Sequence, residues 1–393
     1  MPFPPVRTIT LGLADPHPLP FDRIQYSVDI LGKASARFTE AGYEVQTVRL
    51  STRPVLDDLA DWSPDALLRY AQELQRMLDD VGLSFCSLGP AQAARPDFPL
   101  DRVDLIADML AATTAISMTA LLATNEYAPR MKAAMRCAGV MKRLAKETPE
   151  GFGNFRFAAL ACVAPGCPFF PSAYHDGPSS LALGVQSVGI VADAIQSMRQ
   201  ENHSPLDLEV ASARIQHALV EHLTPVVELG RKFAAEQRVT FGGIDLSPAP
   251  LGEASIAGAL EMCGYGHIGA PGTVAVVAAL THALKHTNLP TCGYCGVMLP
   301  VLEDAVLGKR WQEGLLRVHQ LLLYSAVCGT GLDTIPLAGN TEGEEIARLL
   351  LDVATLATRL HKPLSARLFP VPGKRSGERT TFTSPYLTNT VVR

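Results

Sequence analysis

The sequence predicts an α/β fold in which helices cover a largely parallel sheet. Segments with strand and helix patterns alternate along nearly all of the 393 residues, and strands joined by helix-length connections pair in parallel. Apolar residues make up 47% of the chain and charged residues 19%, which is enough apolar material for a large core. No repeat, low-complexity tract or linker interrupts the alternation, so we expect one domain over residues 1–393.

The amino-terminal half supplies most of the alternation. Ile9, Leu11 and Leu13 recur at every second position, so they fall on one face of a strand. The further segments are assigned by the same patterns. We expect strands at 7–13, 43–50, 83–88, 116–122 and 155–163, and helices at 21–41, 64–81, 100–112 and 130–146.

The carboxyl-terminal half continues with longer helices. Residues 184–199 pass from strand to helix, and 206–238 form a long helical stretch that we expect Pro225 to break, because proline lacks an amide donor. Thr341–Glu344 has the pattern of a capping box that begins a helix. A strand at 364–369 follows and ends at a proline.

Charge and segment patterns narrow the function classes. The 34 basic and 39 acidic residues give a net charge of -5, which argues against a general nucleic-acid binder. The first residues lack the charged and apolar regions of a signal peptide, and no apolar run reaches membrane-spanning length. We therefore expect a cytoplasmic protein with no nucleic-acid or membrane partner. Most of its eight cysteines should be reduced and buried.

A dinucleotide-binding pattern occurs at Gly264–Gly269, but its context does not fit. The mechanism needs a strand before the first glycine, whereas residues 254–262 have a helical pattern. We therefore interpret Gly264 as the end of that helix. Thr273 begins the next helix, whose free amides could hold an anion.

Asp245 and Ser247 form the most informative polar pair. They alternate with Ile244 and Leu246, so both side chains lie on one face at the carboxyl end of a strand. Ligand sites in parallel α/β folds lie at such ends. The alternative is that the two side chains cap the next loop or helix.

Other polar groups admit two interpretations each. His175 could be a base or a ligand, or it could belong to a turn stabilised by Asp176. Glu303 and Asp304 could bind a divalent cation weakly, or they could begin a helix. We expect no tightly bound metal, because no set of cysteines and histidines has the spacing of a tetrahedral site.

Cys292 and Cys295 form a C-x-x-C motif. Such a motif can be a redox dithiol, half of a zinc site, or a nucleophilic thiol with a neighbour. Gly293 and Gly296 favour a tight loop instead of the strand-to-helix turn of a thioredoxin-like site. The loop is mostly apolar, so we expect both thiols to be buried and to face one cavity with Asp245.

Taken in order along nearly the whole chain, several short motifs resemble the domain of unknown function 711 family, also called uncharacterised protein family 0210. They are Arg7–Gly12, Ala173–His175, Gly243–Ser247 with Ala249–Pro250, Pro271–Thr273, Pro300 with Glu303–Asp304, Gly331–Asp333 and Ala366–Pro370.

The resemblance implies a fold similar to the barrels of pyruvate formate-lyase and the anaerobic ribonucleotide reductases. Such a barrel has ten strands in two parallel halves, an internal hairpin loop and helices outside. Residues 289–299, with Cys292 and Cys295, would be that loop. The tail after Arg367 lacks the glycyl radical signature, so we expect no radical chemistry.

These observations lead to one functional hypothesis and one alternative. We expect an enzyme that acts on a small polar or anionic metabolite inside the barrel, without a cofactor, and we allow for a homo-oligomer. The alternative is a metabolite-binding regulator without turnover. The candidate catalytic residues are Asp245 and His175 as acid or base and Cys292 or Cys295 as thiol; the candidate binding residues are Ser247, His267, Thr273, Glu303, Asp333 and Arg367.

Overall fold

The computed structural model describes residues 3–201, 205–250 and 253–393, and they form one mixed sheet flanked by helices. The sheet has nine strands in the order β7-β6-β1-β2-β3-β4-β5-β9-β8. Their bounds are β1 Val6–Gly12, β2 Val48–Ser51, β3 Cys86–Ala91, β4 Ile116–Ala123, β5 Phe157–Ala161, β6 Ser180–Val185, β7 Thr240–Asp245, β8 Gly331–Ala338 and β9 Leu364–Val371.

The strands fall into two groups that run in opposite directions. β1 to β5 pair in parallel with one another. β6 lies antiparallel beside β1, and β9 lies antiparallel beside β5. β7 and β8 then pair in parallel with β6 and β9. The carboxyl end of β7 therefore lies at the same end of the sheet as the amino ends of β1 to β5.

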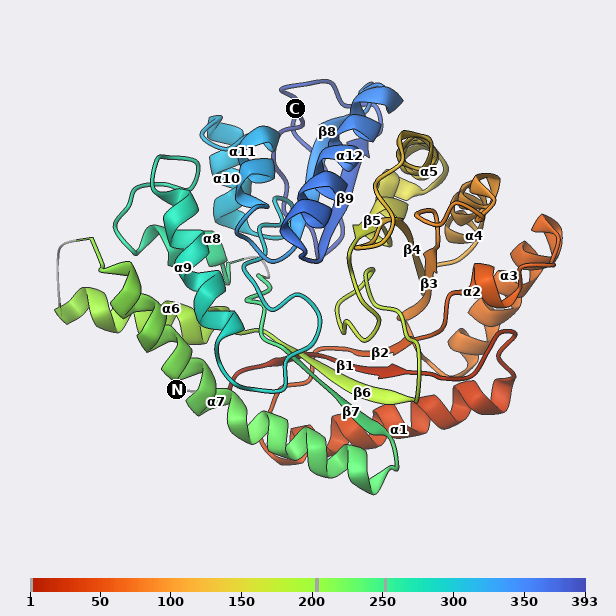
Figure 1. Ribbon diagram of the computed structural model, residues 1–393, viewed down its shortest axis with the longest axis horizontal. Helices are drawn as coiled ribbons and strands as arrows, with labels where there is room; N and C mark the ends of the chain where they lie inside the picture. The colour runs from red at the N-terminus through yellow and green to blue at the C-terminus, as the bar shows by residue number, and fades with distance from the viewer. Residues whose placement is uncertain (1–2, 202–204, 251–252) are drawn as a thin grey trace.

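Helices cover the outer side of the curved sheet, as Figure 1 shows for α1, α7 and α12. The apolar side chains between helices and sheet form one large buried cluster. No described helix has both the length and the apolar character needed to cross a bilayer. The helices are α1 Phe21–Glu40, α2 Val55–Asp58, α3 Pro64–Asp80, α4 Leu105–Ala111, α5 Met131–Glu147, α6 Val188–Glu201, α7 Leu208–Glu236, α8 Ile256–Glu261, α9 Thr273–Lys285, α10 Ala305–Glu313, α11 Val318–Tyr324 and α12 Gly343–Leu360, with 3-10 helices η1 Leu100–Asp104 and η2 Pro149–Phe155.

Two helix predictions need correction. α7 continues through Pro225, because this residue lies on the exposed side, where water can hydrate the carbonyl that loses its amide partner. α12 begins after Glu342 without a side-chain cap, so the predicted capping box does not form. The Thr341 carbonyl instead accepts a hydrogen bond from Lys142 Nζ at 2.9 Å.

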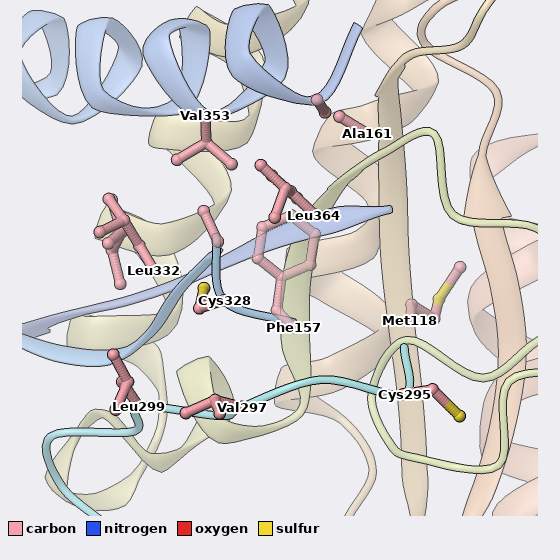
Figure 2. Close-up of a cluster of buried hydrophobic side chains, with 14 of the residues drawn as sticks. Met118, Phe157, Ala161, Cys295, Val297, Leu299, Cys328, Leu332, Val353 and Leu364 are labelled. Carbon is pink, nitrogen blue, oxygen red and sulfur yellow. The ribbon is translucent and has the colours of Figure 1, made fainter. Parts of the chain in front are cut away.

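The segment 289–299 is an irregular, largely buried stretch between β7 and β8. Thr291 pairs with Ile244 of β7, and Pro300 pairs with Asp333 of β8, each through an isolated parallel bridge. Val297 and Leu299 belong to the main apolar cluster, and Figure 2 shows them near Cys328 and Leu332.

Glycine permits the close packing of this segment. A Cβ atom on Gly296 would lie 2.5 Å from the Gly329 Cα atom, and one on Gly293 would collide with the Asp245 carboxylate. Gly293 also has a φ of 68°, a conformation that glycine adopts without strain. Positions 293 and 296 therefore both require glycine, because any side chain there would collide with the neighbouring atoms.

Candidate functional site

A cavity of about 360 Å³ lies at the end of the sheet where β1 to β5 begin. Arg7, Arg49, Phe85, Ser117 and Arg156 line it from these strands or from the residues just before them. The opposite strands contribute Asp333 from β8 and both Ser365 and Arg367 from β9. Tyr294, Met298 and Pro300 of the internal segment and Ala249 and Pro250 after β7 complete much of the wall.

The cavity is strongly cationic. Four guanidinium groups line it, from Arg7, Arg49, Arg156 and Arg367. The described carboxylates in the lining are those of Glu303 and Asp333, which leaves an excess of two positive charges. A low-dielectric wall strengthens the field of these charges, so the cavity attracts an anion.

Arg367 forms salt bridges with both carboxylates. Its Nε atom lies 2.6 Å from Asp333 Oδ1, and its Nη2 atom lies 2.5 Å from Glu303 Oε1. All three side chains are at least nine-tenths buried, and the Phe155 ring lies 5.1 Å from the guanidinium carbon. The structure thus brings together three of the residues that the sequence nominated as binding groups.

Glu303 is an acid of the cavity wall whose pKa is raised by its surroundings. Burial raises its pKa, and the neighbouring Asp333 charge raises it further, although Arg367 and Arg7 oppose this rise. The carboxyl group can therefore hold a proton closer to neutral pH than an ordinary glutamate. A group of this kind can act as a general acid or base.

Arg49 has no such carboxylate partner among the described residues. Its Nε atom donates to Thr47 Oγ1 at 3.0 Å, and the Phe85 and Phe170 rings lie 5.1 and 5.2 Å from its guanidinium carbon. The side chain is nearly fully buried. Burial, followed by the Arg7 charge, lowers the pKa of Arg49 to about 9, so the cation persists at neutral pH.

The other two arginines, Arg7 and Arg156, use some of their donors in hydrogen bonds within the protein. Arg7 Nη1 donates to Gln46 Oε1 at 3.0 Å. Arg156 donates to the carbonyls of Ile116 and Leu110, both at 2.7 Å, and burial lowers its pKa to about 10. Arg156 therefore links the start of β4 to the end of α4, whereas within the part of the chain that the structure describes Arg49 donates only to Thr47.

Asp245 does not line this cavity. Its carboxylate is completely buried and accepts hydrogen bonds from the Ser247 amide and hydroxyl and from the amides of Tyr294 and Cys295, at 2.6 to 3.1 Å. The Ser247 hydroxyl in turn accepts from the Gly296 amide at 3.1 Å. Burial raises the Asp245 pKa, and these hydrogen bonds oppose the rise. Asp245 and Ser247 lie on one face, as predicted. Their side chains bind the amides of the internal segment and do not face a ligand cavity.

His175 lies at the other end of the sheet from Asp245. Its amide donates to the Thr52 carbonyl, just beyond the end of β2, and its Nε2 atom donates to the Pro178 carbonyl at 2.9 Å. Asp245 is level with the start of β1 through Gly184. The two candidate catalytic residues His175 and Asp245 therefore do not face one cavity, because the length of β1 separates them.

His267 and Thr273 also lie outside the cavity lining. His267 is exposed and pairs with Glu261, which Arg310 also contacts. Thr273 is the first residue of α9, and its hydroxyl donates to the Ala270 carbonyl at 2.8 Å. Gly264 follows α8 with a φ of 88°, as the interpretation of this glycine as a helix end predicted.

The two cysteines of the internal segment do not line the cavity either. Cys295 is buried and Cys292 is half-buried. Burial raises the pKa of both thiols well above the ordinary value, and the Asp245 charge adds to the rise. Both thiols are therefore protonated at neutral pH, which leaves them poor nucleophiles.

The adjacent acids Glu303 and Asp304 do not act together. Glu303 faces Arg367 in the cavity, whereas Asp304 is the N-cap of α10 and accepts from the amides of Val306 and Leu307. Among the described residues, no three histidine, cysteine, aspartate or glutamate side chains converge on one point where a metal could bind.

Sequence reasoning missed three of the four arginines that line the cavity, and it missed the aromatic rings. Arg49 lies within a four-residue strand, and an arginine inside a short buried strand is a signal for a lined cavity. Arg7 occupies the same kind of position in β1 and begins one of the family motifs. Tyr386 comes from the tail, and no local pattern connects it with strands far away in sequence.

Comparison with known proteins identifies the family. Residues 4–383 match the family described as Uncharacterised ACR (DUF711). The chain belongs to this family. A UPF0210 protein of Desulforudis audaxviator is 30% identical over 407 residues, which cover 96% of this chain and 88% of the relative. A UPF0210 protein of Pyrobaculum arsenaticum is 30% identical over 359 residues, which cover 86% and 76%. The predicted family is thus confirmed.

A solved structure shows a similar arrangement of elements. The DUF711 chain is similar to the anaerobic ribonucleotide reductase from Thermotoga maritima, with a TM-score of 0.45 and 9% sequence identity. The match covers 92% of this chain and 75% of the reductase chain.

Proposed function

We propose that this DUF711 protein is an enzyme that binds a small anionic metabolite in the arginine-lined cavity. Arg49 and Arg7 would hold the anionic group, and Glu303 would exchange a proton with the bound molecule. The observation that carries the proposal is Arg49, a buried cation without a carboxylate partner in the described chain.

The energetics of burial support an anionic ligand. Removing a charge from water costs free energy that a partner of opposite charge recovers. Arg367 has such partners in Glu303 and Asp333, but among the described residues Arg49 contacts only a hydroxyl and two ring faces. A carboxylate or phosphate would supply the missing charge and match the planar guanidinium with two parallel hydrogen bonds.

The acid Glu303 in the same cavity wall supports the proposal that the protein is an enzyme. Glu303 has a raised pKa and lies beside the cations, so a ligand held by Arg49 would lie near a group that can give or take a proton. The thiols of Cys292 and Cys295 would have no part in this chemistry, because they lie outside the cavity lining.

Closure of the sheet into a barrel belongs to the proposal. The bridges of Thr291 to β7 and of Pro300 to β8 join the internal segment to both edge strands. We therefore propose that residues 291–300 take the place of an irregular tenth strand and close the wall around the cavity.

We also propose a cytoplasmic location. All eight cysteines are unpaired, and a reducing compartment keeps cysteines in this state.

Binding is tested with inorganic phosphate by isothermal titration calorimetry at constant ionic strength. Arg49→Met keeps the side-chain length and removes the cation, and Arg348→Met removes an exposed arginine as a matched control. We expect phosphate to bind to the wild type and to Arg348→Met, and the affinity of Arg49→Met to fall by at least about tenfold. Equal affinity in all three proteins would exclude Arg49 as the anion site.

Turnover is tested with an extract of small metabolites analysed by mass spectrometry. The wild type should consume an anionic compound that Glu303→Gln binds but leaves unchanged. If the wild type retains a compound and converts none, the protein is a binding regulator without turnover, and the catalytic part of the proposal fails.

A further inference from the structure

We infer that the ligand carries a planar unsaturated ring next to its anionic group, and that Tyr386 selects this ring by stacking. The inference rests on the proposed function, because it names the class of molecule that the arginine cavity would bind. It assigns a specificity-determining role to the carboxyl-terminal segment.

Three aromatic rings form a parallel stack along the cavity wall. The Phe152 and Phe155 rings lie 5.0 Å apart with an interplanar angle of 17°, and the Phe155 and Tyr386 rings lie 5.9 Å apart with an angle of 18°. Phe155 is the middle ring, and Tyr386 is one end of the stack. No ring of the described chain covers the other face of Tyr386, and the side chain lines the cavity.

The carboxyl-terminal segment fixes Tyr386 in this place. Arg379 and Val391 form an antiparallel bridge, so the residues between them fold back as a loop. Phe382 and Leu387 on either side of Tyr386 are buried in an apolar cluster with Leu302. The Thr388 amide also donates to the Leu302 carbonyl at 2.6 Å. The tip of the loop is thus held against the cavity from both sides.

Tyr386 lies near the anion-binding arginine. Tyr386 and Arg49 line the same cavity, and Tyr386 is among the groups whose electrostatic interaction affects the pKa of Arg49. A ligand whose anionic group contacts Arg49 would therefore bring its adjacent atoms to the ring of Tyr386. A bulky group directly attached to the anion would occupy this position.

The remaining wall suits a flat apolar body. Phe169, Phe170, Pro171 and Met298 line the cavity, and most of their surface is apolar. Stacked rings attract each other beyond the gain from burying their area, so a ring is favoured over a saturated group of similar size. The attraction corresponds to about threefold to tenfold in affinity.

The test compares benzenesulfonate with cyclohexanesulfonate, which have the same anionic group and rings of similar size. We expect the wild type to bind benzenesulfonate about threefold to tenfold more tightly than cyclohexanesulfonate. This preference should disappear in Tyr386→Leu and persist in Tyr386→Phe, which keeps the ring. Equal binding of the two sulfonates by the wild type, or an unchanged preference in Tyr386→Leu, would overturn the inference.

A third probe separates this inference from the proposed function. Methanesulfonate has the anionic group without a ring, so Arg49→Met should weaken its binding whereas Tyr386→Leu should not. If methanesulfonate depends on Arg49 but the wild type shows no preference for the aromatic ring, only the ring inference fails. If no sulfonate binding depends on Arg49, the proposed function fails as well.

Discussion

The buried charges of Asp245 and Arg49 lie at the same end of the sheet, but they differ in their hydrogen-bond partners. The Asp245 carboxylate accepts four hydrogen bonds from the protein and lies outside the cavity lining. The Arg49 guanidinium lines the cavity, donates one hydrogen bond within the described chain and has no carboxylate partner there. Burial of a charge alone therefore does not identify a binding site. Unused hydrogen-bonding capacity beside a cavity is the better criterion.

The two regions are nevertheless connected through the internal segment. Asp245 holds the Tyr294 amide, and the Tyr294 hydroxyl donates to Ser172 Oγ at 2.7 Å. Both Tyr294 and Ser172 line the cavity. Asp245 is thus a positioning residue: it shapes one wall of a cavity that its own side chain does not line.

The largest effect is expected from Arg367→Met. This variant leaves Glu303 and Asp333 buried without their common partner, so the free energy of unfolding should fall by about 3–5 kcal/mol. Arg49→Met is the matched control, because it leaves no buried carboxylate unpaired, and its stability should not fall below the wild type by more than about 1 kcal/mol. Urea denaturation measures both. Equal losses in the two variants would contradict the distinction between them.

A smaller loss is expected from Asp245→Asn. One acceptor oxygen becomes a donor that faces an amide, which should cost about 1–3 kcal/mol of unfolding free energy. The exposed Asp352→Asn serves as control and should change stability by less than about 0.5 kcal/mol. If Asp245→Asn were as stable as this control, the hydrogen bonds around Asp245 would not hold the internal segment.

The smallest effect concerns pH and the cavity. Burial raises the Glu303 pKa above the ordinary value of 4.5, so protonation removes a negative charge beside Arg7 and Arg367 as the pH falls. Benzenesulfonate keeps its charge, and its affinity should therefore rise about threefold to tenfold between about pH 8 and about pH 5. In Glu303→Gln the affinity should be high and independent of pH. A wild-type affinity that falls towards acid pH would reverse the sign and refute this assignment.

Local patterns predicted the elements of the fold better than its closure. Ile9, Leu11 and Leu13 recur at every second position, a pattern typical of a strand, and β1 forms over Val6–Gly12. The antiparallel placement of β6 and β9 depends on contacts between distant segments, so no local pattern indicates it. Pro225 was predicted to break a helix because it lacks an amide donor, but α7 continues through it, since solvent exposure at that position lowers the cost of the lost hydrogen bond.

The candidate site was predicted only in part, for a related reason. Glu303, Asp333 and Arg367 were nominated through the family motifs and meet in the cavity. Asp245 has the residue type and strand position of a catalytic acid, but amides from the distant internal segment consume its hydrogen-bonding capacity. Tyr386 has no sequence signal, because only the folding of the tail brings it to the cavity.

The central claim is that the cavity binds an anion at Arg49, and selenate soaked into crystals of the protein tests it most directly. Selenate has the shape and charge of sulfate, and selenium can be located by anomalous diffraction. The account predicts the strongest selenium peak inside the cavity, with oxygen atoms at hydrogen-bond distance, about 3 Å, from the Arg49 guanidinium. Selenate bound only at the protein surface, with the cavity free of anomalous signal, would contradict the account.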